Sequence, residues 1–193
     1  FTWSAPSGSI PSDADLFATE YRIDQKLIES AGISYSAAIH VAVIDSATLE
    51  PWEIRYSSNG VLLNPNNNFG NANDNYPING HTRYFVFYPT SASSATNLKN
   101  MLVNGVPNGS YVLLYTWING GFQNWGDTSL FTVLENMGAD SVRFLPNYKG
   151  WAFFARKGYP ATSVERFSPG NGRFRVSLTG NMEAIVNQGS ILD

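Results

Sequence analysis

The sequence contains no cysteine among its 193 residues, so disulfide bonds, thiolate metal sites and a cysteine nucleophile are excluded. It also lacks any run of about 18 apolar residues, the length that a membrane-spanning helix requires. Charged residues make up only 14% of the chain, and the formal net charge is -3. A charge this small provides no strong field for nucleic acid or an anionic membrane. We therefore expect neither a nucleic-acid partner nor a transmembrane segment.

Residues that could carry catalysis are sparse. Of the two histidines, His40 falls in a predicted strand and His81 at the start of another, and neither has a second ligand at metal-binding spacing. We interpret them as a surface strand histidine and a loop histidine. The sequence has no G-x-S-x-G elbow, no G-x-G-x-x-G and no P-loop. Its acids are scattered at turns and helix ends, where capping explains them better than glycoside hydrolysis. We expect no catalytic site.

An asparagine-dense segment, residues 64–75, shares some features of a calcium loop, in which oxygen ligands alternate around a glycine. Its one acid is Asp74, and the distal glutamate of such loops is missing. Asparagine tolerates left-handed backbone, so this segment is typical of an irregular surface insertion, here 59–80. We expect no metal and no cofactor.

The stretch from 107 to 160 is the most regular part of the chain. Residues 111–117 and 151–155 are β-branched, aromatic and aliphatic, which predicts two buried strands. A turn signal at 107–109 precedes the first strand, and Asn119-Gly120-Gly121 ends it. Between them Asp127 predicts a helix start and Gly138 its left-handed end. The helix is marked by apolar residues at helical spacing, namely Leu130, Val133, Leu134 and Met137.

Other segments complete an α+β pattern. Residues 93–104 predict a helix that turns Ala95, Leu98, Met101 and Leu102 inward and stops at Gly105. Residues 15–31 are predicted as a helix, although Phe17, Tyr21 and Ile23 also alternate as in a strand. Strands are predicted at 38–45, paired with 52–56 across a turn, and at 83–88, 173–178 and 184–186.

The fold class that follows is α+β, with twisted antiparallel sheets packed as a sandwich and two or three short helices outside. Three regions are predicted along the chain. Residues 1–36 form a linker or entry segment packed on the core, and its first 14 or so residues, rich in Ser, Pro and Gly, are a linker or an edge strand. Residues 37–160 form the core, and residues 161–193 supply C-terminal strands that complete the domain.

The ordered set of motifs resembles the interleukin-like EMT inducer domain, also called the GG domain. The resemblance covers about 38 to 158 and includes a strand that ends in a glycine loop, a helix that closes on glycine, and an aromatic strand of the form W-x-F-x-x-x-K-G. Those motifs are 117–121, 135–138 and 151–158, preceded by 39–45 and Leu49-Glu50-Pro51-Trp52. The "PW" hairpin and the stretch PNGSYVLLYT, residues 107–116, look most like copies embedded in large bacterial type IX-secreted surface proteins with gingipain-like peptidase domains.

The resemblance implies an extracellular or cell-surface location and a non-catalytic role as a spacer or a weak carbohydrate-binding module. Its partners would be neutral glycans or neighbouring domains of the same polypeptide. The ends of the chain, at Phe1 and Asp193, lead us to expect a domain excised from a longer protein. A free-standing secreted, cytokine-like binding protein is the alternative, and a glycan-active enzyme comes third.

Some GG domains bind sugar through an acid before the loop glycine and an arginine three positions before the strand tryptophan. Here those positions hold no acid and Tyr148, so the charged pair is absent. Rings and amides still suit neutral sugars, through stacking and hydroxyl hydrogen bonds. The resemblance places the loop 118–125 beside the turn 146–150, whereas Trp117 and Trp151 are interpreted as core residues. The predicted ligand-binding residues are Asn119, Gln123, Trp125, Asn147, Tyr148 and Lys149.

Overall fold

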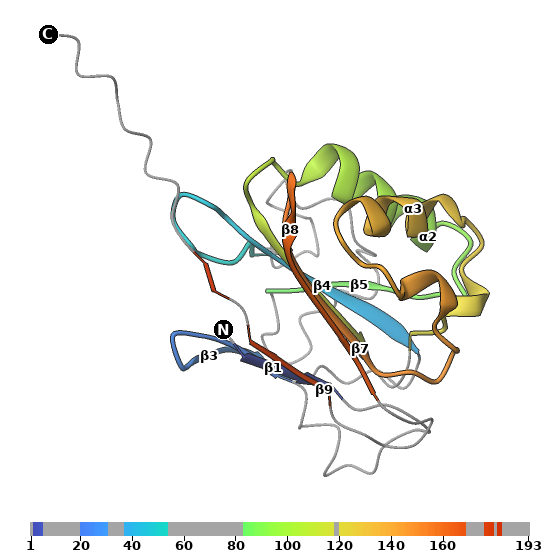
Figure 1. Ribbon diagram of the computed structural model, residues 1–193, viewed down its shortest axis with the longest axis horizontal. Coiled ribbons are helices and arrows are strands. Elements are labelled where there is room, and N and C mark those ends of the chain that lie inside the picture. Colours follow the sequence, from blue (N-terminus) through green and yellow to red (C-terminus); the bar gives the residue numbers. More distant parts are fainter. Residues whose placement is uncertain are drawn as a thin grey trace, which may run out of the picture.

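The computed structural model describes residues 2–5, 20–30, 37–53, 83–117, 120–168, 176–179 and 181–182. In these residues two antiparallel β-sheets combine with two α-helices, which confirms a mixed α+β fold dominated by sheet (Figure 1). None of the described helices is long and apolar enough to cross a membrane.

A five-stranded sheet forms the centre of the structure, in the order β5-β4-β6-β7-β8. All four pairings are antiparallel. The strands are β5 (Phe85–Phe87), β4 (Ala38–Ile44), β6 (Tyr111–Trp117), β7 (Trp151–Arg156) and β8 (Tyr159–Phe167). Every residue of β4 is buried, because both faces of this inner strand are covered, and its sequence is accordingly an almost unbroken apolar run.

The predicted strands in this sheet are confirmed with one omission. β4, β6 and β7 match their predicted ranges closely, and β5 is shorter than the predicted 83–88. β8 is absent from the prediction and crosses the predicted boundary at 160/161. Pro160 lies near its start, and most of its residues are exposed or half-buried, as on a sheet edge where a missing N–H is tolerated.

A four-stranded antiparallel sheet contains strands from both ends of the chain. Its order is β3-β2-β1-β9, from β3 (Lys26–Ser30), β2 (Glu20–Ile23), β1 (Thr2–Ala5) and β9 (Val176–Thr179). β1 pairs with β2 on one side and β9 on the other, so residues 2–5 are an inner strand and not a linker or edge strand. β9 overlaps the predicted strand 173–178.

The predicted helix over 15–31 is wrong where the structure describes it. Residues 20–30 form the β2–β3 hairpin, joined by Asp24 and Gln25 with φ of 48° and 68°. Two positive φ values match the type I′ turn, whose twist suits a two-residue hairpin. The alternation of Tyr21 with Ile23 carried the strand signal, because both side chains pack against the five-stranded sheet. Tyr21 is fully buried.

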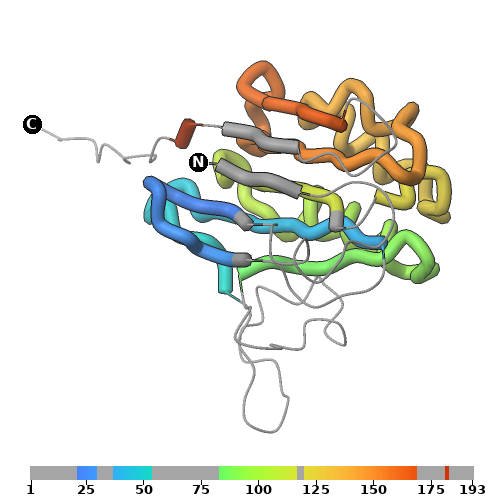
Figure 2. The backbone as a smooth tube through the Cα atoms, turned by 90° about the horizontal axis from the view of Figure 1, so that it is seen from below, coloured from blue at the N-terminus to red at the C-terminus, as the bar shows by residue number. Residues whose placement is uncertain are grey.

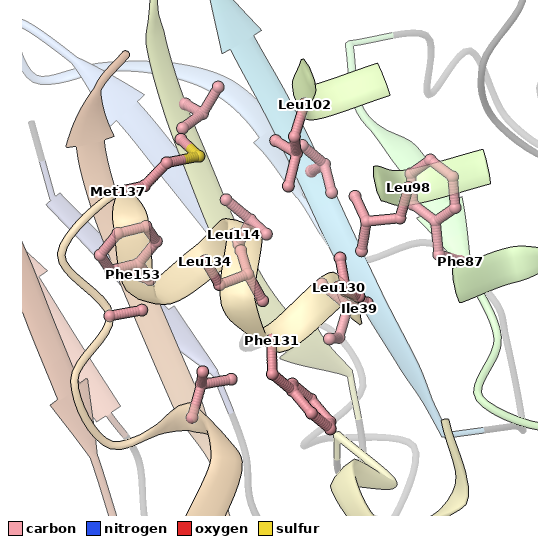
Figure 3. Packing of buried hydrophobic residues seen from close by; sticks show 14 of the residues in the cluster. Ile39, Phe87, Leu98, Leu102, Leu114, Leu130, Phe131, Leu134, Met137 and Phe153 are labelled. Carbon is pink, nitrogen blue, oxygen red and sulfur yellow. The ribbon is translucent and has the colours of Figure 1, made fainter. Parts of the chain in front are cut away.

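Helices cover one face of the five-stranded sheet. They are α2 (Ser94–Asn100), which continues into the π-helical turn η3 (Met101–Gly105), and α3 (Ser129–Asn136). The other two predicted helices are thus confirmed, and their predicted inward residues pack in one apolar cluster with the sheet (Figure 3). Val133 is only partly buried. Two short 3₁₀ turns complete this side, η4 (Phe122–Asn124) and η5 (Val142–Phe144).

The other face of the five-stranded sheet carries a second cluster, formed by Tyr21, Ala42, Ile44, Tyr111, Leu113, Tyr115, Ala152 and Phe154. Tyr21 comes from β2, and its hydroxyl donates to the carbonyl of Arg83 at 2.8 Å. Figure 2 shows the β2–β3 hairpin, in blue, beside the strands of the five-stranded sheet. This contact joins the two sheets.

The prediction for His40 is also wrong. Its side chain is only 1% exposed, so it is not a surface strand histidine. The imidazole stacks on Tyr84 with ring centroids 4.6 Å apart and meets Tyr115 edge-on at 5.2 Å. Because β4 is covered on both faces, alternation along it does not distinguish a surface side from a core side.

The predicted hairpin after β4 begins as expected. Ile44 and Pro51 form an antiparallel bridge, and the N–H of Trp52 donates to the carbonyl of Val43 at 2.8 Å. Its second arm past residue 53 lies outside the described residues. So do the insertion 59–80 with its loop 64–75, His81 and the predicted strand 184–186.

Candidate functional site

The predicted site lies where β6 ends and β7 begins. These strands are antiparallel neighbours, so the loop after one and the turn before the other meet at the same end of the sheet. The N–H of Gly121 donates to the carbonyl of Asn147 at 3.2 Å, and the N–H of Gln123 donates to Asn147 Oδ1 at 2.7 Å. The segments 120–125 and 146–150 are therefore side by side, as predicted. We call them the loop corner.

The first loop is shaped by a glycine and two buried rings. Gly121 has φ of +54°, and a Cβ there would come within 2.5 Å of Pro89 Cγ, so the position requires glycine. Phe122 is 2% exposed and meets Trp151 edge-on, with centroids 5.6 Å apart. Trp125 is 4% exposed, and its Nε1 donates to the carbonyl of Gly120 at 2.9 Å. Trp125 is thus a core residue whose ring leaves little surface open to a ligand.

The second segment is held by the end of β8. Lys149 Nζ donates to the carbonyl of Ser168 at 2.8 Å. The N–H of Ser168 donates to the carbonyl of Gly150 at 2.9 Å, and the Gly150 N–H donates to Ser168 Oγ at 3.2 Å. Lys149 is half-buried, as is Asn147. Both residues therefore support the turn by direct hydrogen bonds.

The remaining predicted residues differ in exposure. Tyr148 is 59% exposed at the tip of the turn, and Gln123 is exposed on the neighbouring loop. Asn119 lies outside the described residues. The structure thus brings five of the six predicted residues together, and it leaves Tyr148 and Gln123 as the two whose side chains are open to solvent.

Two further exposed rings, near the loop corner, were not among the predicted site residues. Phe144, at the end of η5, is 80% exposed, and Phe167, opposite Trp151 in the β7–β8 pairing, is 48% exposed. With Tyr148 they make three of the six large apolar or aromatic side chains that are exposed in the described residues. Periodicity gives no signal for Phe144, which belongs to a single 3₁₀ turn, and Phe167 could be placed only once β8 is recognised.

Trp151 forms a rigid base beneath the loop corner. Its ring is fully buried, and its Nε1 donates to Glu165 Oε1 at 2.8 Å. The same carboxylate accepts the N–H of Ser141 through Oε2 at 3.0 Å. The Trp151 N–H donates to Thr116 Oγ1 at 3.0 Å. The segments that carry the exposed rings are therefore joined to a buried, hydrogen-bonded part of the core.

No family model and no curated protein matches the chain. Among the described residues, no three His, Asp or Glu side chains are grouped so that they could hold a metal ion.

Among the described residues, the carboxylates whose pKa values depart from the ordinary range are all shifted downward. A hydrogen bond from the Thr48 N–H lowers the pKa of Asp45, and one from Lys99 lowers the pKa of Asp127 to about 2. A hydrogen bond from Arg143 lowers the pKa of Glu135. A general acid needs the opposite shift, so these three groups are suited to structural pairing and not to proton donation.

Proposed function

We propose that the chain is a non-catalytic, extracellular carbohydrate-binding module of a larger bacterial surface protein, and that the loop corner recognises neutral glycans weakly. The observation that carries the proposal is the exposure of three rings: Phe144 in η5, Tyr148 in the turn before β7, and Phe167 in β8 opposite the start of β7. Exposed aromatic rings offer flat apolar surfaces on which the C–H faces of a sugar can stack.

The polar groups of the loop corner fit the same ligand. Gln123 adds an exposed amide that can both donate to and accept from sugar hydroxyls. Lys149 already donates to Ser168, and the charged pair found in sugar-binding GG domains is absent from the sequence. Without a charged anchor, the loop corner is suited to a neutral ligand that is held by stacking and a few hydrogen bonds.

Membership of the GG domain family belongs to this proposal. It is supported by the order of the strand, glycine loop, helix and aromatic strand between β6 and β7. A sandwich packing of the two sheets is also proposed. Its support is Tyr21 of β2, which is buried in the cluster on the far face of the five-stranded sheet.

The test is an NMR titration with neutral methyl glycosides and short neutral oligosaccharides. We expect chemical-shift changes confined to 120–125, 144 and 146–150, with dissociation constants on the order of 1 mM, equivalent to about 4 kcal/mol. Tyr148→Ala and Phe144→Ala should weaken binding. Tyr159→Ala is the matched control, because this exposed ring lies at the opposite end of β7.

Absence of shifts with every neutral glycan at about 10 mM would leave the domain as a structural spacer, since weaker contacts have no use at ordinary ligand concentrations. Equal binding by the Tyr148→Ala protein would place the glycan elsewhere. A robust turnover of any glycoside that one side-chain change abolishes would replace the binding role by an enzymatic one.

A further inference from the structure

Four planar side chains form a continuous stack from the core to the surface on the β-sheet face away from α2 and α3. Phe154 stacks on Tyr111 with ring centroids 5.6 Å apart and an interplanar angle of 7°. The guanidinium of Arg156 lies 5.4 Å from the Tyr111 centroid and 4.5 Å from the Tyr159 centroid. Exposure rises along the stack, from 2% at Phe154 and 4% at Tyr111 to 49% at Tyr159.

The guanidinium of Arg156 is held between the rings of Tyr111 and Tyr159 and by a hydrogen bond from its Nε. Arg156 Nε donates to the carbonyl of Gly109 at 3.2 Å. In the described part of the chain, no carboxylate pairs with Arg156 and no acceptor bonds its two terminal nitrogens. The adjacent Lys157 is already occupied, since its Nζ donates to the carbonyls of Val103 and Val106 at 2.7 Å and 2.6 Å. Arg156 therefore presents a planar pair of donors whose orientation is set before any ligand arrives.

We propose that Arg156 and Tyr159 form a binding site for the carboxylate of an acidic sugar. A guanidinium fork matches a carboxylate through two parallel hydrogen bonds, and stacking between rings reduces the side-chain freedom that binding would otherwise cost. A purely structural arginine would need only the bond to Gly109 and the contact with Tyr111, and would not require an outer ring.

The surroundings favour a sugar acid over a larger anion. One cation suits a monoanion, whereas phosphate groups are usually bound by several donors and charges. The exposed Tyr159 ring offers a stacking surface beside the guanidinium. Asn108 is exposed and lies against Gly158, where a Cβ would be 3.9 Å from Asn108 Oδ1. Its amide adds the donor and acceptor that sugar hydroxyls use.

This site is separate from the loop corner. Trp151 and Arg156 are at opposite ends of β7, about 16 Å apart at the usual rise of a strand. Tyr111 and Arg156 are direct partners in the β6–β7 pairing, so the stack belongs to the other end of both strands. The two sites can therefore be tested independently on one protein.

The experiment is an NMR titration of the whole chain with the sodium salt of methyl galacturonide, with methyl galactoside, acetate and sulfate as comparison ligands. We expect saturable shifts at Arg156, Tyr159 and Asn108 with the uronide at millimolar concentration, and none with the neutral galactoside. Arg156→Lys keeps the charge and loses the fork, so it should weaken uronide binding at least about tenfold, the loss of roughly one charged hydrogen bond. Tyr159→Leu should weaken it as well, and this variant leaves Arg156 in place if the lysine protein proves unstable.

Arg166→Gln is the matched control, because Arg166 is exposed on β8 and bonds only the carbonyl of its neighbour Glu165 among the described residues. It should bind the uronide as the unaltered protein does. Equal shifts with acetate or sulfate would overturn the sugar-acid assignment in favour of a general anion patch. Uronide binding that survives both Arg156→Lys and Tyr159→Leu, or no shift at about 10 mM, would overturn the site itself.

Discussion

The indole Nε1 of Trp151 donates a 2.8 Å hydrogen bond to the carboxylate of Glu165, which joins the buried start of β7 to the edge strand β8. The second oxygen of Glu165 accepts the Ser141 N–H from the segment before η5. One carboxylate thus connects three pieces of chain around a fully buried ring. Trp151 also stacks on Phe153, with ring centroids 5.7 Å apart.

Replacement of Trp151 should therefore be severe. We expect Trp151→Ala to lower the free energy of unfolding by about 3–5 kcal/mol, because it opens a cavity and leaves the Glu165 carboxylate without its indole donor. Trp151→Phe should cost less, since it keeps most of the apolar volume. Urea denaturation followed by circular dichroism measures both changes.

Tyr148→Ala is the control for this measurement, because the Tyr148 ring is exposed and its removal should change stability by no more than about 0.5 kcal/mol. If Trp151→Ala unfolded at the midpoint of the unaltered protein, the packing of β7 against the helices would be refuted.

Gly138 should tolerate no side chain. Its φ is +99°, and a Cβ would lie 2.8 Å from the carbonyl oxygen of Pro160 and clash with the Ser163 hydroxyl. We expect Gly138→Ala to destabilise the protein by at least about 2 kcal/mol, from left-handed strain together with a backbone contact that cannot move aside easily. Gly126→Ala is the matched control, because a Cβ there meets nothing within 4 Å. Similar unfolding midpoints for the two variants would contradict this account of the end of α3.

Strands and helices were predictable where residue propensity, apolar spacing and the start and stop signals all indicate the same element. The runs 111–117 and 151–155 have high strand propensity, and residues 111–116 and 151–155 are buried, so β6 and β7 follow directly. For α3 the apolar spacing, the start at Asp127 and the stop at Gly138 all coincide. Asp127 Oδ1 accepts the N–H of Ser129, the first residue of α3. The meeting of the two loops was expected from the resemblance to the GG domain, in which the strands beside these loops are neighbours.

The failures came where local pattern and tertiary packing differ. Residues 20–30 carry mixed apolar spacing, and only the two left-handed residues Asp24 and Gln25 decide for a hairpin. Trp125 has a loop sequence around it, yet its indole finds a carbonyl partner inside the protein. The exposure of Phe144 depends on the tertiary position of η5, a single 3₁₀ turn, which periodicity does not encode. Site residues were thus harder to predict than strands.

Buried tyrosines should limit stability at high pH. Burial raises the pKa of Tyr21, Tyr84 and Tyr115, with the charge of Glu29 as a further cause in each case. An unfolded tyrosine ionises near pH 10, so above that pH the unfolded chain loses protons that the folded protein keeps. The stabilisation is complete below about pH 10 and declines as the pH rises toward the folded values.

We expect the urea midpoint to fall above about pH 10, and Tyr84→Phe to make that fall shallower, because one of the groups that causes it is gone. The exposed Tyr148 provides the control, as Tyr148→Phe should leave the alkaline slope unchanged. Equal slopes in the unaltered and Tyr84→Phe proteins would show that Tyr84 is not buried as described.

Asp127, one of the carboxylates with a lowered pKa, links α2 to the start of α3. Lys99 Nζ donates to Asp127 Oδ2 at 2.6 Å, and this bond, with those from Ser129, lowers the pKa of Asp127 from 3.8 to about 2. A lowered folded pKa means that the stabilisation is present above about pH 4 and is lost as the pH falls to about 2.

Asp127→Asn should therefore unfold at a lower urea concentration than the unaltered protein at neutral pH, and the gap between the two urea midpoints should close near pH 2. Asp140→Asn, a change at an exposed acid with no bond among the described residues, should show no such convergence. A gap of constant size from neutral pH to about pH 2 would mean that the charge of Asp127 does not hold the two helices together.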